Sequence, residues 1–506
     1  MFIRTLHTKA GTTQIQVVEK VGRINKIIKH IGTARAPLEV SQLEDRAQVF
    51  IDEKRITSGV VSLFDSRYEP SELQTIVSRL AFPHVWDTVT YRFLFHCYHA
   101  IGFSVIVDSC FTDLVIARII EPASKRKTRN ILEIRFGKHY SLTGIYRCMK
   151  TAIQHQYQKQ IEQIVYEFVK RQTGADIGVL FFDVTTLYYE AFDEDDFRRY
   201  GFSKDHKTNQ PQVVVALTVT SSGIPLDLHM FSGNTFEGHT MLPCIEAVLE
   251  KYTLPARDMV VVADSAMLSD DNIAVLEKKH LKYIVGARLG NLSQKIFTRV
   301  IKTPKTDGAC TRIDLTDGRI LLVGYSTKRA VKDRRDREKQ IQKATAALTK
   351  PSSLSRKYKF VYAKESGIYE LNKTLVTKAE QLEGLKGYVT NAVKLSDTNI
   401  IEKYTNLWQV EKSFRMSKSD LKARPIFHTI KQSIEAHLLI IFTALVVSCY
   451  VEMMTGKSIG SVLNTLNQVK EIIVEDRISK QRTSTYSNST TEAHTLFTAI
   501  NMPWVT

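Results

Sequence analysis

The sequence has few of the residues that mark a disulfide-linked or zinc-binding protein. Only 6 of its 506 residues are cysteine, and no two of them stand in a C-x-x-C pair. Scattered cysteines of this kind fit buried thiols in a reducing compartment, and they argue against a disulfide framework or a zinc site. The first residues, MFIRTLHTKAGTTQIQ, also lack the long apolar core of a signal peptide. We therefore expect a cytoplasmic protein.

Long hydrophobic runs are also scarce. The most apolar stretch, residues 436–451, has sixteen residues without Lys, Arg, Asp or Glu. A helix that spans a bilayer needs roughly 20 such residues. We therefore expect a buried helix here and no membrane partner.

Acidic residues are the minority among the charges. Against 70 Lys and Arg stand 53 Asp and Glu, which gives a net charge of +17 and a pI near 9.4. With 43% hydrophobic residues, the chain has the composition of a globular protein, and its length suggests roughly three or four domains. The positive excess favours a nucleic acid as partner, because bound phosphates release counterions. Ribosome-associated and membrane-surface proteins are basic too, so charge alone leaves these alternatives open.

Two regions precede the most regular part of the sequence. Residues 1–60 alternate in hydrophobicity and predict a small basic β-hairpin region, followed by a linker around Thr33–Pro37. Residues 61–174 are helical in pattern, with a helix start at Ser124. The basic side chains after it favour a DNA-binding domain of the helix-turn-helix kind. An all-α packing domain with solvated basic faces is the alternative.

From residue 175 the pattern becomes that of an α/β protein. The apolar runs IGVLFFD, QVVVALTVT, IPLDLHMF, DMVVVAD and KYIVGAR predict strands, with helices before and after DMVVVAD. The order β-β-β-α-β-α-β specifies a mixed sheet with flanking helices. We assign residues 175–287 to the first part of this core and 386–456, which begins near the strand GLKGYVTN, to the second. Residues 457–506 then form a C-terminal helical tail.

Residues 288–385 interrupt this core, and we expect them to form a basic, β-rich insertion. Between Lys328 and Lys359 the sequence has twelve Lys and Arg but only three Asp and Glu. A solvated helix is one interpretation. An excess of one sign favours a surface that faces DNA, and the candidate DNA-binding residues are Lys328, Arg329, Arg334 and Arg335.

Two aspartates follow buried strands. Asp183 ends the first strand of the core and Asp264 ends the fourth. If these strands are neighbours, both carboxylates lie at one edge of the sheet. Carboxylates suit Mg²⁺ or Mn²⁺, and two such ions can clamp the attacking and leaving oxygens when a phosphodiester is cut. A single Asp at a strand end is also a common turn residue.

The third acid comes from a long helix that we expect to begin near Thr398. Five polar or aromatic residues recur there at steps of three and four and so share one face: Tyr404, Trp408, Glu411, Arg415 and Lys418. Glu411 could complete a metal site, while Arg415 and Lys418 could hold phosphates. The alternative is an amphipathic helix with a Glu411–Arg415 ion pair.

These segments resemble the DDE transposases of bacterial insertion sequences, over roughly residues 175–450. FFDVTTLYYEA resembles the strand of the first Asp, VVVADSAMLSDDN that of the second, and YVTN the strand before the last acid. The helix is similar to the YREK signature of the cut-and-paste branch that has a β-rich insertion before the Glu. Tyr404, Leu407, Glu411 and Lys418 stand at its positions, so Leu407 replaces the Arg.

The resemblance implies an RNase-H-like core and a site in which Asp183, Asp264 and Glu411 hold Mg²⁺ or Mn²⁺. It implies binding to terminal inverted repeats and to target DNA, cleavage and strand transfer, and a homodimer in a synaptic complex. Tyr404 and Trp408 would contact DNA. The place of action would be the bacterial cytoplasm, at the nucleoid. Two alternatives remain: a metal nuclease on the same fold, and a catalytically inactive DNA-binding descendant.

Overall fold

A computed structural model describes residues 1–8, 11–22, 24–57, 77–174, 178–190, 193–202, 209–255, 257, 259–265, 269–348, 358–363 and 369–504. The chain forms two compact units, one of residues Met1–Pro83 and Val474–Thr483, the other of His84–Ile473 and Ser484–Thr506. Three strands have residues in both units: β4 (Leu80–Trp86), β15 (Lys470–Asp476) and β16 (Arg482–Ser487). The boundary predicted at residues 60/61 lies outside the described residues.

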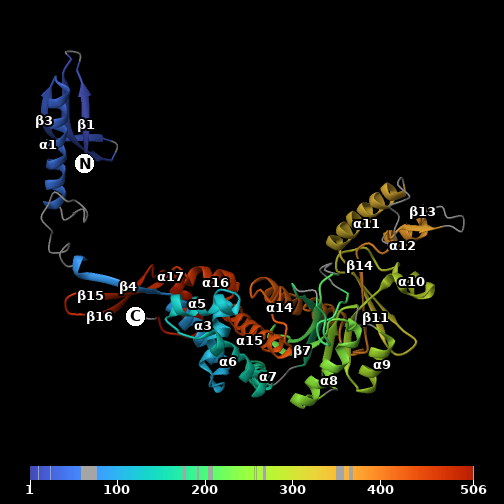
Figure 1. Cartoon of the computed structure of the whole chain (residues 1–506). Helices are drawn as coiled ribbons and strands as arrows, with labels where there is room; N and C mark the ends of the chain where they lie inside the picture. The colour runs from blue at the N-terminus through green and yellow to red at the C-terminus, as the bar shows by residue number, and fades with distance from the viewer. Residues whose placement is uncertain are drawn as a thin grey trace. The chain divides into compact units, whose positions relative to one another are not determined.

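The first unit contains a small antiparallel sheet and one helix (Figure 1). The sheet has the order β1 (Phe2–His7), β2 (Thr13–Val21) and β3 (Ile24–Ala34), and α1 (Pro37–Thr57) packs on it. Ile15, Val17, Ala47 and Ile51 form the core between them. The predicted hairpin is confirmed as the antiparallel pair β2–β3, but the end of β3 and the start of α1 lie where the linker was expected. Pro37 begins α1, because its fixed φ suits the first position of a helix.

The second unit begins with a group of helices after β4. These are α3 (Thr88–Ile101), η1 (Phe103–Val105), α4 (Ser109–Ile120), α5 (Lys125–Phe136), α6 (Leu142–Gln154) and α7 (Tyr157–Thr173). Ser124 caps α5, as the sequence predicts: its Oγ accepts the Lys127 N–H at 3.3 Å. The described part of residues 61–174 is therefore mainly helical, as expected, and β4 precedes its helices.

A helix from the far end of the chain completes this group. α15 (Lys431–Thr455) packs against α3, α4 and α6, and α16 (Ile459–Leu466) and α17 (Thr491–Ala499) pack near its end. By length and composition α15 could cross a membrane, but 89% of its most apolar window is buried inside the protein. The prediction of a buried helix at residues 436–451 is confirmed. Residues 457–506 contain strands as well as the expected helices.

The centre of the second unit is an eight-stranded mixed sheet with the order β10-β11-β14-β9-β8-β5-β6-β7. Its strands are β5 (Val179–Tyr188), β6 (Gln212–Thr220), β7 (Pro225–Ser232), β8 (Val260–Ala263), β9 (Lys282–Ala287), β10 (Cys310–Asp314), β11 (Ile320–Tyr325) and β14 (Leu385–Thr390). Only the pairs β5–β8 and β8–β9 are parallel. The connections η2 (Glu237–His239), α8 (Met241–Tyr252) and α9 (Asp270–Lys278) complete the predicted order of strands and helices.

Helices cover both faces of the sheet. α13 (Asp397–Thr405) packs on β8 and β9, and α14 (Trp408–Ser419) packs on β5 and β6. Lys251 of α8 bonds to Asp227, whose strand partner is Thr218. Leu217, the next residue of β6, lines a hollow with Phe414 of α14. Since neighbouring residues of a strand face opposite ways, α8 and α14 lie on opposite faces, as Figure 1 shows.

The insertion at residues 288–385 is not β-rich as predicted. Its described residues form η5 (Leu289–Asn291), α10 (Gln294–Val300), α11 (Thr327–Leu348), β12 (Val361–Ala363), β13 (Tyr369–Leu371) and α12 (Lys373–Gln381), besides β10 and β11. The charged run became α11 because Ala, Lys, Arg, Glu and Gln favour a helix and show no strand alternation. β10 and β11 join the central sheet through β14, so the insertion extends that sheet.

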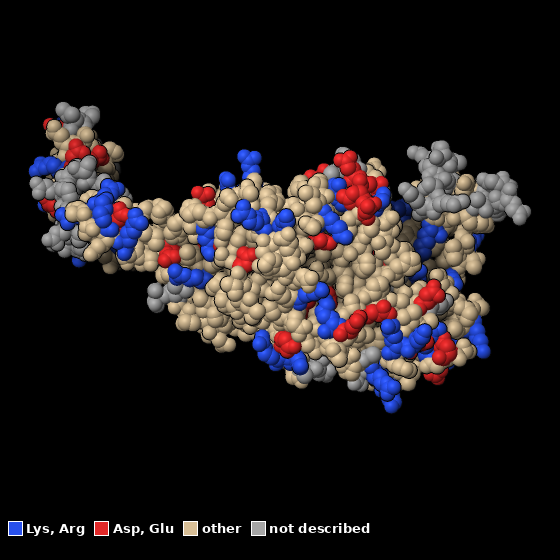
Figure 2. Space-filling model, turned by 60° about the horizontal axis from the view of Figure 1, so that its bottom comes forward, with Lys and Arg blue, Asp and Glu red and all other residues tan. Residues whose placement is uncertain are grey.

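Charges of both signs are spread over the surface. On the face drawn in Figure 2, Lys and Arg are interspersed with Asp and Glu, and no single basic stripe crosses it. The net charge of +17 therefore does not point to one surface there. Which basic residues are available to a partner depends on whether each already has an acidic neighbour.

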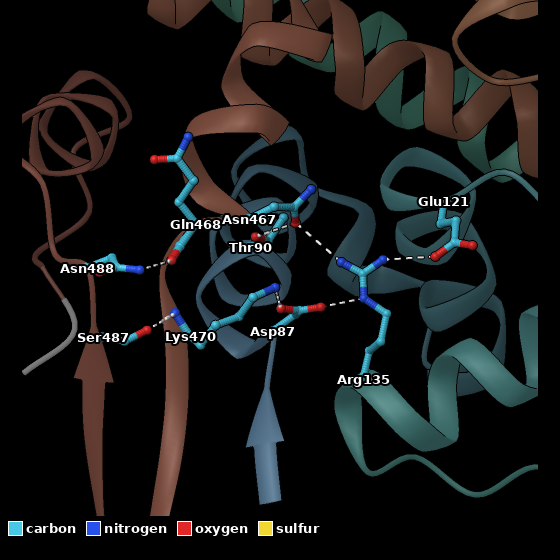
Figure 3. Close-up of polar contacts among 9 residues, drawn as sticks. All are labelled: Asp87, Thr90, Glu121, Arg135, Asn467, Gln468, Lys470, Ser487 and Asn488. Carbon is cyan, nitrogen blue, oxygen red and sulfur yellow. Dashed lines mark hydrogen bonds and ion pairs between the residues drawn. The ribbon is translucent and has the colours of Figure 1, made fainter.

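A buried aspartate connects distant parts of the helical group (Figure 3). Asp87 lies just before α3, and its carboxylate accepts bonds from Arg135 of α5 and Lys470 of β15. Arg135 also donates to Glu121 at 3.0 Å and to Asn467 at 3.4 Å. The network joins the start of α3, the end of α5 and the segment after α16.

We predict that Asp87→Ala lowers the free energy of unfolding by about 2–3 kcal/mol, because it leaves two partly buried cations without their acceptor. The matched control is Asp196→Ala. That acid is fully exposed and pairs with Arg199 at 3.3 Å, so its loss should cost less than about 1 kcal/mol. Urea denaturation of both variants measures the difference. Equal losses would contradict a structural role for the network.

Candidate functional site

Asp183 and Asp264 occupy matching positions on neighbouring strands. β5 and β8 are parallel, and the last residues paired between them are Phe182 and Ala263. Asp183 follows Phe182 in β5, and Asp264 follows Ala263 at the end of β8. Asp183 pairs with Leu217 of β6. Because paired residues of neighbouring strands face the same side, Asp183 lies on the face of the sheet that α14 covers. The two aspartates thus follow the same paired position of neighbouring parallel strands.

Asp183 does not end its strand, although the sequence analysis expected this. β5 continues to Tyr188, which pairs with Gln212 of β6. Asp264, by contrast, directly follows the last residue of β8. The reason is that β6 continues to pair with β5 beyond the end of β8, and the residues VTTLY favour an extended strand. Asp183 is half-buried and Asp264 exposed.

The expected long helix is divided into α13 and α14. At Asn406 and Leu407 the backbone leaves the regular pattern: the Leu407 N–H bonds to the Tyr404 carbonyl at 3.0 Å and the Val410 N–H to Leu407 at 3.1 Å. These shorter i→i−3 bonds tighten the turn. Tyr404 therefore lies in the last turn of one helix, and Glu411 lies in the first turn of the next.

Asp264 and Glu411 line one cavity of about 740 Å³. Its walls come from the sheet, from α11 and α12 of the insertion, and from the α13–α14 segment. Trp408 and Arg329, both predicted to bind DNA, also line it, as does Leu407. Trp408 is 49% exposed, so its indole is available at the wall. Asp183 is not among the lining residues.

Tyr404 lies against the second aspartate. It is only 5% exposed, and its hydroxyl donates to Asp264 Oδ1 at 3.5 Å. Burial and then the Asp264 charge raise the pKa of Tyr404, so the hydroxyl keeps its proton and remains a donor. Its burial leaves little surface for the direct DNA contact that the sequence predicted, and we assign it to positioning Asp264.

Lys386 is a neighbour of the acids that the sequence analysis missed. Its Nζ lies 4.4 Å from the centre of the Tyr404 ring. Burial, followed by Arg329, lowers the pKa of Lys386, whereas Asp264 and Glu411 oppose that shift. Its place in GLKGYVTN, just before the last predicted strand residues, was the only available signal. The cavity thus has a cation close to both carboxylates.

A glycine makes the approach of Tyr404 possible. A Cβ atom on Gly286 of β9 would lie 2.5 Å from the Tyr404 hydroxyl and 3.3 Å from the Ser265 backbone nitrogen. No side chain fits at that distance. The strand KYIVGAR therefore supplies a gap beside Asp264 as well as a neighbour for β8.

Two other predicted residues are not brought to the cavity. Arg415 lines a separate hollow with Glu452 and Asp420. Lys418 lies with Phe414 and Thr185 near the sheet. The break between the helices and the turn of α14 direct these side chains away from Glu411. Of the five residues expected on one helix face, Tyr404, Trp408 and Glu411 line the cavity, and Arg415 and Lys418 do not.

The predicted residues of α11 differ in their partners. Lys328 and Arg335 are exposed and have no hydrogen bond or ion pair with the described residues. Arg334 pairs with Glu383 at 3.3 Å, and Arg329 with Asp333 at 3.4 Å. Lys328, Arg329 and Arg335 line a second hollow along the helix.

The acids have the chemistry of a divalent-metal site without a completed ligand set. No group of three or more His, Cys, Asp and Glu side chains in the described part of the chain could hold a metal ion. Mg²⁺ is commonly bound through one or two carboxylates, with water and substrate phosphates filling the remaining positions. Glu411 has no hydrogen-bond or ion-pair partner among the described residues. The two acids that line the cavity, Asp264 and Glu411, thus have the donor chemistry that such an ion requires.

We predict that Gly286→Ala lowers the free energy of unfolding by about 1–3 kcal/mol, because the added methyl collides with the Tyr404 hydroxyl. Adding Tyr404→Phe should restore part of this loss, and a double-mutant cycle by chemical denaturation measures it. Gly290→Ala is the control, since nothing lies within 4 Å of its Cβ position. Strictly additive effects of the two substitutions would show that a collision with the Tyr404 hydroxyl is not what destabilises Gly286→Ala.

The chain was compared with known proteins. The family model described as "Transposase DDE domain" matches residues 174–447, more than half of the chain. No curated protein matches the chain. Among solved structures, it is similar to a cryo-EM structure of the piggyBac transposase synaptic complex with hairpin DNA, at 8% identity and a TM-score of 0.37. The match covers 74% of this chain and 70% of that one, and a likeness this distant carries no further argument.

The matched segment contains both strands with their aspartates, the insertion, α13 and α14. It therefore covers the cavity and all three acids predicted from the sequence. The chain belongs to the DDE transposase family.

Proposed function

We propose that the protein is a transposase of a bacterial insertion sequence that binds terminal inverted repeats and catalyses cleavage and strand transfer of DNA. The observation that carries the proposal is the register of β5 and β8, in which Asp183 and Asp264 directly follow the last paired residues. Glu411 lines the same cavity as Asp264. The order β7-β6-β5-β8-β9, in which β6 is antiparallel and β8 parallel to β5, supports an RNase-H-like core.

Asp183, Asp264 and Glu411 would hold Mg²⁺ or Mn²⁺. Such an ion supplies an activated oxygen nucleophile and relieves charge on the leaving oxygen. The chain itself orients the donors: Tyr404 fixes one oxygen of Asp264 through its hydroxyl. Lys386 and Arg329 place positive charge at the wall, where a phosphate would enter.

The proposed DNA partner fits the distribution of free cations on α11. Lys328, Lys332, Arg335 and Lys339 line one hollow, while Arg337 on another side of the helix donates to Glu383 at 2.7 Å. One side of α11 thus pairs with acids of the insertion, and the other carries Lys and Arg side chains without an acidic partner in the described ranges. The hollow shares Arg329 with the acid cavity, so DNA along α11 would lead to it. We also propose that a homodimer brings two DNA ends together in the cytoplasm, at the nucleoid.

The chemistry is tested with Mg²⁺ and a duplex that carries the inverted repeat found in the DNA flanking the gene. We expect cleavage with a 3′-hydroxyl at the repeat boundary, followed by joining to a second duplex. Asp183→Asn, Asp264→Asn and Glu411→Gln should each lower cleavage by about 10²-fold or more, since each removes a charged ligand. Asp271→Asn, an exposed acid of α9, should retain full cleavage.

Two other outcomes would favour the alternative functions. Cleavage without joining would indicate a metal nuclease on this fold. Binding of the repeat without cleavage would indicate an inactive DNA-binding descendant. If all three acid variants cut at the rate of the unchanged protein, the proposed site is wrong.

DNA binding by α11 gives a separate prediction. We expect Lys328→Met with Arg335→Met to weaken binding of any duplex and to lower the salt slope of the affinity by about two. The control pair, Lys295→Met with Arg299→Met, removes the same charge from exposed positions of α10 and should change the slope less. Fluorescence anisotropy at several salt concentrations measures both. Identical slopes for the two pairs would mean that α11 acts only through net charge.

A further inference from the structure

Four basic side chains gather inside the helical part of the second unit. They are Arg118 of α4, Lys125 of α5, His428 of the segment before α15, and His437 of α15. Arg118 and His437 are each 6% exposed and Lys125 is 5% exposed, while His428 is half-buried. Buried charged groups in proteins are normally paired with opposite charge. This group is unusual because all four members are basic and none forms an ion pair with an acid among the described residues.

The polar atoms of this basic cluster are poorly satisfied. Arg118 donates to the Ala123 carbonyl at 3.0 Å. Lys125 has no hydrogen bond or ion pair with any described residue, and His437 Nδ1 is buried without a partner. The rings of His428 and His437 lie 5.2 Å apart. One buried nitrogen of the cluster, His437 Nδ1, therefore has no partner among the described residues, and Lys125 makes no hydrogen bond or ion pair with them.

The mutual influence of these groups shows how close they are. Burial, and then Arg118, lower the pKa of Lys125 well below its usual value. Burial, followed by Lys125 and Arg118, lowers the pKa of His428 to about 4. Burial and the same two cations also lower the pKa of His437. Among the described residues, no carboxylate contributes to any of these shifts.

The N-terminus of α5 adds to the same region. Lys125 is the first residue of this twelve-residue helix. The Ser124 side chain accepts the Lys127 N–H, whereas the backbone N–H groups of Lys125 and Arg126 have no acceptor among the described residues. Free N–H groups and the helix dipole make such an end favourable for an anion. The helix end and the buried basic side chains therefore point to the same kind of ligand.

We propose that the basic cluster and the N-terminus of α5 form a binding site for a phosphate group. An anion here would accept hydrogen bonds from Lys125 and the free α5 amides and would offset the charge of Arg118. We propose access from the side of His428, the least buried of the four, whose ring packs edge-on to that of the exposed Tyr146, with 6.3 Å between the ring centres. The phosphate could belong to a DNA backbone or be a free inorganic ion, since both present the same oxygens.

This site is separate from the proposed catalytic site. None of its four basic residues lines the cavity of Asp264 and Glu411, and none of them belongs to a strand of the sheet. The inference therefore does not rest on the transposase chemistry. A full-length protein that carries Asp264→Asn can be used throughout, so loss of cleavage does not affect the test.

The test is thermal unfolding of the full chain in sodium phosphate and in sodium chloride of equal ionic strength. We expect phosphate to raise the Tm beyond chloride, because a ligand that binds only the folded state stabilises it. Lys125→Met should weaken phosphate binding about ten-fold or more, the loss of one charge-assisted hydrogen bond. Lys150→Met, which removes an exposed charge from α6, should leave the phosphate effect unchanged.

A second measurement covers the case in which Lys125→Met does not fold. In the unchanged protein, the imidazole resonances of His428 and His437 should shift in phosphate but not in chloride. Equal unfolding and equal spectra in both salts would overturn the proposal. So would identical phosphate responses of Lys125→Met and Lys150→Met.

A duplex distinguishes the two sources of phosphate. If the site takes a DNA phosphate, Lys125→Met should lower the salt slope of DNA binding by about one relative to Lys150→Met. If DNA binding is the same in both variants while the phosphate effect is lost, the ligand is free phosphate.

Discussion

The parallel pairing of β5 with β8 is the constraint on which the site depends. It aligns Phe182 with Ala263, and each strand then continues into an aspartate. Because paired residues of parallel strands point to the same face, one register sets both carboxylates together, and a shift of one residue would separate them. Both strands are buried on both faces, as parallel strands usually are, so the hydrophobic core holds the register.

The surroundings of Asp264 come from several distant segments. Gly286 leaves space, Tyr404 fills it with a hydroxyl, and Lys386 lies over the tyrosine ring. These residues belong to β9, α13 and β14, so the position of the carboxylate depends on the packing of α13 on the sheet. The insertion closes the cavity from the other side through α11 and α12. A single acid is therefore held by elements that are separated by more than a hundred residues of sequence.

Basic residues in this protein have two different functions. Arg135, Lys470 and Arg337 are held by buried acids and stabilise the fold. Others, such as Lys328 and Lys125, have no acidic partner among the described residues. Lys328 is exposed on α11, which borders the cavity, whereas Lys125 is buried at the N-terminus of α5. Net charge predicts a polyanionic partner, but only the partner of each side chain shows where it could bind.

The sequence by itself determined the order of strands and helices in the core and the buried helix at residues 436–451; its choice of Asp183, Asp264 and Glu411 stays a prediction. Apolar runs and periodicity are local signals, and they suffice for these conclusions. The sequence did not predict the features that depend on contacts between residues far apart in the chain. Pairing with β6 extends β5 past Asp183, the turn at Asn406 and Leu407 divides the long helix, and packing directs Arg415 and Lys418 away from Glu411. Only the tertiary structure placed Lys386 and Gly286 beside the acids, because their roles depend on contacts across strands and helices.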